Sequence, residues 1–216
     1  MKRTLIASAV AVVATLLITG PYSAFGTHTP ANKAVASGSK IEEIAPGTNK
    51  VLMQATLRTS KPQDLLIGVN LECTILTSLI TGGENAESST ARGEVRVWTE
   101  LDGNIVPINT ISSGRNEAPA PGDETDKITF CDRTYSRSVT DTENDDDGTD
   151  TESDFIRTKS AHSFQWVRLN AGSGVHTIVV KADLTVNTAG DAVAEAIVGN
   201  RTLIVEPERF ANDASV

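Results

Sequence analysis

The chain has 216 residues, is 39% hydrophobic and carries a formal net charge of −9 at pH 7. This acidity argues against binding to nucleic acid or to an anionic membrane surface, because both carry charge of the same sign. Only 4% of the residues are aromatic, so we expect a core built mainly from Val, Ile, Leu and Ala. A length of this order suits one large β domain better than two small ones.

Residues 1–26 have the order of a secretory signal peptide. Lys2 and Arg3 give a positive start, residues 5–18 form an apolar run, and residues 24–26 include small side chains for cleavage. The apolar run is too short to span a bilayer comfortably, since about 20 residues are needed. We therefore predict cleavage after this segment and a secreted mature chain without a membrane span. An uncleaved N-terminal anchor is the alternative.

The first strands are predicted after a stretch of small and polar residues. Residues 27–50 are rich in Ala, Ser, Thr, Gly, Pro and Lys without an apolar period, and we interpret them as a flexible lead. Alternating apolar and polar residues predict a strand over 51–58. A turn follows at 61–64, and residues 65–75 show the clearest alternation in the chain, with Cys73 on the apolar face.

The middle of the chain is expected to hold further strands joined by polar loops. The sequence predicts a loop over 82–90, then a hairpin of strands 94–101 and 105–111 around Asp102-Gly103-Asn104. Pro107 argues that the second hairpin strand lies at an edge or contains a bulge. A second loop is predicted over 112–126 and a strand over 127–139.

The remaining sequence alternates short strands with turns. Strands are predicted over 155–159, 164–169, 176–186, 192–198 and 202–206, the last two joined around Gly199-Asn200. We find no convincing helical period over a longer segment. Short strands at this spacing predict an all-β fold, a two-sheet antiparallel sandwich of jelly-roll or Ig-like type. The predicted domain spans 51–210, with a tail over 211–216.

Cys73 and Cys131 are the two cysteines of the chain. In an oxidising compartment a single disulfide between them is the simplest interpretation. Two buried thiols that do not meet are the alternative. A metal site built on the pair is disfavoured, because no His or further Cys lies nearby in the sequence to complete a tetrahedral ligand set.

Residues 141–154 form an acidic insert with eight carboxylates and no basic residue. If Gly148 is the sharp-turn glycine of a Ca²⁺ loop of about 12 residues, carboxylates fall at four of its ligand positions. These ligands would be Glu143, Asp145, Asp147 and Asp154. The first of them is Glu where Asp is expected, and the flanks look like strands. The sequence therefore favours a solvated loop over a Ca²⁺ site, with repulsion between the carboxylates keeping the loop extended.

No catalytic residue can be assigned from the sequence. It contains no nucleophile elbow, no metal-binding His pair and no phosphate-binding glycine loop. His176 lies on the apolar face of a predicted strand and is interpreted as a hydrogen-bonded core residue. Trp98 and Trp166 would offer a sugar-binding platform if they were exposed, although packing in the interior is favoured for both. Apart from Ca²⁺ at the acidic insert, no cofactor is expected.

The closing strands resemble those of jelly-roll domains related to tumour necrosis factor and complement-type globular heads. The matching residues lie in two predicted strands. The strand after a small-residue turn carries Gly174, His176, Thr177 and Val180, and the strand that ends the domain carries Arg201, Leu203 and Val205. The resemblance implies trimerisation, although no collagen-like stalk accompanies it. The segment 61–77, KPQDLLIGVNLECTILT, is also similar to a group of exported bacterial proteins without assigned activity.

The sequence thus predicts a secreted, non-catalytic β-sandwich module for binding or surface structure. One alternative is a secreted carbohydrate-active enzyme or carbohydrate-binding protein, suggested by the many carboxylates and the two Trp. Such an enzyme would need two facing carboxyl groups about 5–10 Å apart. Another is a structural subunit of a homo-oligomer or fibre, which would expose a large apolar patch.

Overall fold

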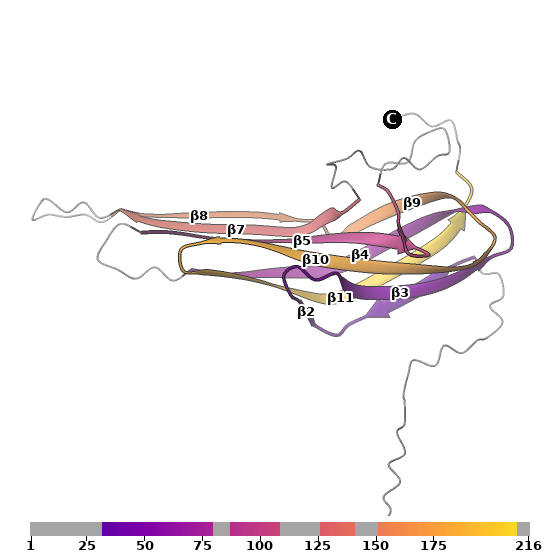
Figure 1. Cartoon of the computed structure of the whole chain (residues 1–216), viewed down its shortest axis with the longest axis horizontal. Coiled ribbons are helices and arrows are strands. Elements are labelled where there is room, and N and C mark those ends of the chain that lie inside the picture. Colours follow the sequence, from indigo (N-terminus) through magenta and orange to yellow (C-terminus); the bar gives the residue numbers. More distant parts are fainter. Residues whose placement is uncertain (1–31, 80–86, 109–125, 141–150, 211–216) are drawn as a thin grey trace, which may run out of the picture.

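The structure is a computed structural model that describes residues 32–79, 87–108, 126–140 and 151–210. These residues form two antiparallel β-sheets packed against each other, and none of them lies in a helix. The strands run along the long axis of the molecule (Figure 1). The predicted all-β, two-sheet sandwich is therefore confirmed. Within the described ranges, no segment has the length and hydrophobicity of a membrane-spanning helix.

One sheet, sheet A, has the strand order β1-β11-β4-β9, and β2 also pairs with β11. Its strands are β1 (Ala34–Gly38), β2 (Glu42–Ile44), β4 (Gln63–Leu79), β9 (Ser163–Ala171) and β11 (Ala192–Glu208). The long central strands β4 and β11 are more than 100 residues apart in the sequence. Sheet A can therefore form only when distant parts of the chain meet.

The other sheet, sheet B, has the order β3-β10-β5-β7-β8, and β6 pairs with β5. Its strands are β3 (Lys50–Thr59), β5 (Glu87–Leu101), β6 (Asn104–Ile105), β7 (Ile128–Thr140), β8 (Thr151–Ser160) and β10 (Gly174–Ala189). At one end of the molecule β7 and β8 run out together as a long hairpin (Figure 1). The predicted hairpin turn at Asp102-Gly103 is present, and both residues have positive φ.

The core lies between the two sheets and is built from alternate residues of the strands. It is mainly aliphatic, as the low aromatic content predicts; the fully buried side chains include Leu65, Ile67, Val69, Val95, Val97, Ile178, Val180, Leu203 and Val205. Trp166 and Phe130 are the largest of the fully buried side chains. Burying one such side chain stabilises the fold by about 1.5–3 kcal/mol.

A disulfide between Cys73 and Cys131 joins the two sheets. Cys73 lies in β4 of sheet A and Cys131 in β7 of sheet B, and their Cα atoms are 6.1 Å apart. The bond therefore links the two sheets covalently. The disulfide predicted from the sequence is present.

The prediction of a flexible lead over 27–50 is wrong for residues 32–50, the part of it that the structure describes. β1 and β2 lie inside 27–50 and both pair with β11, so the sandwich begins at Ala34 rather than at residue 51. The sequence signal was weak because the inward residues of β1 are Ala34 and Ala36, which add little hydrophobicity. Ile44 of β2 is 1% exposed and does belong to the core.

The buried Arg201 explains why this early segment is held in place. Its guanidinium donates hydrogen bonds to the carbonyl oxygens of Leu52 at 3.0 Å and Lys40 at 2.7 Å. It also pairs with the carboxylate of Glu42. The Arg201 side chain thus links β11 to β3 and to the segment between β1 and β2.

Several predicted boundaries also need correction. Gly199-Asn200 is not a turn between two strands, because β11 runs through it and shifts register against β4 between Val198 and Arg201. β5 begins at Glu87, inside the loop predicted over 82–90. β6 has only two residues, and β8 includes the last residues of the acidic insert. The signal peptide, the tail and most of the loop predicted over 112–126 lie outside the described residues.

Removing the disulfide should destabilise the fold without changing it. The bond closes a loop of sequence separation 58, which corresponds to about 4 kcal/mol in the chain-entropy model. We expect Cys73→Ser/Cys131→Ser to lose most of that free energy of unfolding in urea denaturation, with a native β-type circular dichroism spectrum. An unfolding free energy equal to that of the wild type would show that the bond does not constrain the chain.

Candidate functional site

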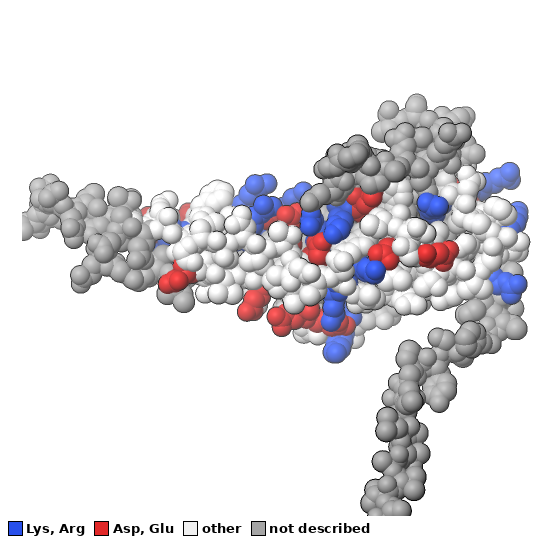
Figure 2. All heavy atoms as spheres, viewed as in Figure 1, with Lys and Arg blue, Asp and Glu red and all other residues white. Residues whose placement is uncertain are grey.

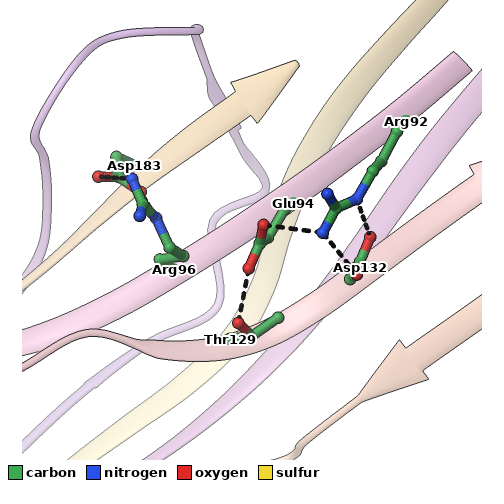
Figure 3. Close-up of polar contacts among 6 residues, drawn as sticks. All are labelled: Arg92, Glu94, Arg96, Thr129, Asp132 and Asp183. Atoms are coloured by element: carbon green, nitrogen blue, oxygen red, sulfur yellow. Dashed lines mark hydrogen bonds and ion pairs between the residues drawn. The ribbon is translucent and has the colours of Figure 1, made fainter. Parts of the chain in front are cut away.

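The outer face of sheet B carries a network of paired charges, which we call the charge ladder. Arg92, Glu94 and Arg96 come from alternate positions of β5 and therefore lie on one face of the sheet (Figure 3). The whole ladder matches four cations with four acids on β5, β7, β10 and the residue before β7; they are Arg92, Arg96, Lys127 and Lys181, with Glu94, Glu100, Asp132 and Asp183.

The first part of the ladder centres on Arg92. Its guanidinium donates two hydrogen bonds to the carboxylate of Asp132, both at 3.0 Å, and a third to Glu94 at 3.1 Å. The bonds to Asp132, followed by the charges of both acids, raise the pKa of Arg92 above its usual value despite partial burial. Glu94 in turn accepts a hydrogen bond from the Thr129 hydroxyl at 2.7 Å. All these groups are engaged with each other (Figure 3).

The second part of the ladder surrounds Asp183 and Trp98. Asp183 accepts hydrogen bonds from Arg96 at 3.2 Å and from Lys127 at 2.5 Å. The ammonium of Lys127 lies 4.2 Å from the centre of the Trp98 ring, and the indole N–H donates to Glu100 at 3.2 Å. Figure 2 shows acidic and basic atoms next to each other over the middle of the visible face. The ladder is therefore a surface without net charge, on which acids and bases are paired with each other.

Both tryptophans are buried. Trp98 lies on the outer face of sheet B but is 2% exposed, while Trp166 is 1% exposed and packs edge-on against Phe164 in the core. Neither ring presents a face on which a sugar could stack. Trp166 occupies the interior position that the sequence favoured, whereas Trp98 is buried on the outer face beneath Lys127.

His176 is the buried, hydrogen-bonded histidine that the sequence predicts. Its Nδ1 lies 2.7 Å from a carboxylate oxygen of Asp102 and its Nε2 lies 2.8 Å from the carbonyl oxygen of Gly172. Burial lowers the pKa of the ring, but these hydrogen bonds and the charge of Asp102 together raise it above the usual value. Because both ring nitrogens face oxygen acceptors, the arrangement suits an imidazolium that donates on both sides. It clamps the β5–β6 turn to the start of β10.

The acidic insert is described only at its end. Glu143, Asp145 and Asp147 of the predicted Ca²⁺ loop lie outside the described residues. Asp154 lies in β8, where its carboxylate accepts a hydrogen bond from the Tyr135 hydroxyl at 3.3 Å. Among the described residues, no three His, Cys, Asp or Glu side chains gather as a metal site would require. The Ca²⁺ site therefore stays a prediction.

A groove of about 350 Å³ lies on the outer face of sheet A, and we call it the Gly68 groove. It is centred on Gly68 of β4, which pairs with Ile204 of β11 on one side and with Gln165 of β9 on the other. The surrounding side chains are Leu66 and Asn70 from β4, Ser163 from β9, Glu206 from β11 and Lys33 before β1. The groove thus lies over Gly68, where the three-strand surface lacks a side chain.

The fold does not require a glycine at the centre of this groove. Gly68 has no positive φ, and a Cβ added there would meet only the carbonyl oxygen of Ile204, at 3.9 Å. At Gly93, by contrast, a Cβ would come within 2.9 Å of the Ile75 side chain. A glycine inside a strand costs stability, and it often marks a place where a ligand or another backbone approaches closely.

The polar groups around the groove are free to bind a ligand. Asn70, Ser163 and Gln165 are exposed, and their side chains form no hydrogen bond with the described part of the chain. Lys33 and Glu206 form an ion pair with each other, so the groove carries no net charge. Sequence analysis missed this site. The one available signal was a glycine in the middle of the most regular predicted strand.

Comparison with known proteins adds no family to this picture. No protein-family model and no curated protein sequence matches the chain. The resemblance of the closing strands to jelly-roll domains consequently assigns no residue a role. Function has to be argued from the surface of the sandwich.

His176 should make stability depend on pH. Because its pKa is raised in the folded state, the clamp contributes fully below the unfolded-state value of about 6.5 and its contribution is lost as pH rises through the folded-state pKa. We expect the stability advantage of the wild type over His176→Gln to shrink from mildly acidic to alkaline pH in urea denaturation. When both proteins also carry Asp102→Asn, the difference in their free energy of unfolding should vary much less with pH. A difference between wild type and His176→Gln that stays constant with pH would contradict the charged clamp.

Proposed function

We propose that the mature chain is an exported, non-catalytic β-sandwich module that binds a neutral, hydroxyl-rich ligand such as a glycan in the Gly68 groove. The observation that carries this proposal is a set of polar side chains without a partner among the described residues, placed around a hollow that the fold does not need. Export is supported by the signal-like sequence of residues 1–26 and by the disulfide, which forms and persists in oxidising compartments.

The chemistry of the groove favours a neutral ligand. Asn70 and Gln165 each offer amide donors and an acceptor, and Ser163 offers a hydroxyl, so all three can exchange hydrogen bonds with sugar hydroxyls. Leu66 and Ile204 supply an apolar floor against which the C–H face of a sugar ring can pack. A charged ligand would find no unpaired counter-charge, because Lys33 and Glu206 neutralise each other.

The groove favours binding over catalysis. A glycosidase uses two carboxyl groups on either side of the bond that it cleaves. Among the described residues that line the groove, Glu206 is the single carboxylate, and it is held by Lys33. The volume of about 350 Å³ is at the small end for ligand sites, which begin near roughly 300 Å³. It suits one or two sugar rings of a longer polymer lying across the sheet.

Filling the groove should abolish binding. We expect the mature protein to be retarded by neutral polysaccharides such as dextran, β-glucan or xylan in affinity electrophoresis. Gly68→Leu should lose this retardation because the new side chain occupies the hollow. Gln165→Ala should weaken it about tenfold, the effect of losing roughly one well-made hydrogen bond.

The matched control is Thr56→Leu, which adds a similar apolar side chain to the exposed outer face of sheet B and should bind like the wild type. Absence of retardation by all neutral polysaccharides, or equal retardation of wild type and Gly68→Leu, would contradict the proposal. Release of reducing sugars by the wild type would instead identify an enzyme.

A further inference from the structure

The outer strand of the β7–β8 hairpin is an open sheet edge. Among the described residues β8 pairs with β7 alone, so one side of its backbone has no strand beside it. Every described side chain from Glu152 to Lys159 is exposed. An edge of this kind presents a row of N–H and C=O groups that can pair with another strand.

The other sheet edges are short or irregular in register, and β8 is neither. β1 is only five residues long, and the register of both β3 and β9 against their neighbours is broken by an irregularity. The pairing of β8 with β7 runs without a register shift from Cys131 opposite Ser160 to Thr140 opposite Thr151. Short length, bulges and charged side chains are the usual protections of an edge, and of these β8 has only charged side chains. β8 is therefore the long, regular edge of the sandwich.

Two large apolar side chains stand in the middle of this edge. Phe155 is 56% exposed and Ile156 is 59% exposed. As neighbours in a strand, they point to opposite faces of the sheet. A strand added to the edge would cover part of each, whereas a ligand bound to one face could cover only one of them. The apolar pair thus fits a partner strand.

The charges of β8 indicate which strand fits. Its first half carries Glu152 and Asp154, and its second half carries Arg157 and Lys159. A second copy aligned parallel and in register would place like charges side by side. By alternation Glu152 and Asp154 point to one face of the sheet and Arg157 and Lys159 to the other. A second copy aligned antiparallel therefore keeps the like charges of the two strands apart, which electrostatics favours over the parallel alignment.

We propose that two copies of this chain pair through β8 in an antiparallel, two-fold arrangement that joins their B sheets. The two-fold axis of such an edge-to-edge dimer is perpendicular to the sheet, so residues on the same face oppose each other. With the axis at Ile156, this residue opposes the partner's Ile156 and Phe155 opposes the partner's Arg157, a cation–π pair. With the axis at Phe155, the carboxylate of Asp154 would oppose the partner's Ile156. The axis therefore lies at Ile156.

Cysteine cross-linking tests the pairing and its register. Directly opposed residues of antiparallel strands have Cα atoms about 4.5–5.5 Å apart, within disulfide range. Ile156→Cys should give a covalent dimer on mild oxidation, seen on non-reducing gels. In Phe155→Cys the two new thiols would be offset along the strands by two residues, with Cα atoms about 8 Å apart, too far for a bond. Cross-linking through Phe155→Cys and not Ile156→Cys would overturn the proposal.

Solution mass tests the dimer in the unlabelled mature protein. By sedimentation velocity we expect a concentration-dependent dimer for the wild type and a monomer for Ile156→Lys. Val193→Lys is the matched control, because Val193 is 52% exposed on β11 of sheet A, and it should dimerise like the wild type. A wild type that is monomeric throughout, or an Ile156→Lys variant that still dimerises, would overturn the proposal. Since β8 and the Gly68 groove lie on different sheets, neither outcome bears on glycan binding.

Discussion

The packing of two aliphatic sheet faces against each other is the constraint on which the rest of this structure depends. With few aromatic residues, the core is filled mainly by Val, Ile and Leu side chains, which alternation along the strands directs inward. β4 and β11 meet from distant parts of the chain, and the Cys73–Cys131 bond fixes one sheet to the other. Alternation also sends the remaining residues to the outer faces, so the same pattern that builds the core decides what the surface can do.

The two outer faces use these residues in different ways. On sheet B, acids and bases from neighbouring strands pair with each other, and Lys127 lies over the Trp98 ring, which leaves few polar groups unsatisfied. On sheet A, Gly68 leaves a hollow whose surrounding amides and hydroxyl have no described partner. Cross-strand ion pairs stabilise a surface, but the paired groups are no longer available to a ligand. The face that leaves Asn70, Ser163 and Gln165 without a described partner is the one suited to a ligand.

The sequence predicts the fold class because it follows from local alternation, and it predicts the disulfide because two cysteines follow a signal-like N-terminal segment. Residues 65–75 and 176–186 show the period of a half-buried strand, and Cys73 falls on the buried side. Alternation does not reveal which strands become neighbours. The Gly68 groove depends on β4 lying between β9 and β11, and the burial of Trp98 depends on Lys127 from the segment before β7. β1 escaped prediction for a different reason, since alanines in an edge strand bury little apolar surface.

Ligand mapping by NMR would test the division between the two faces most directly. In a ¹⁵N-labelled sample titrated with a neutral oligosaccharide, the account predicts shifts at the backbone amides of Gly68, Gln165 and Ile204 and at the side-chain amide of Asn70. The amides of Arg92, Arg96 and Asp132, on the charge ladder of sheet B, should not shift. Shifts confined to the charge ladder, or none at any concentration of the sugar, would contradict the assignment of binding to sheet A.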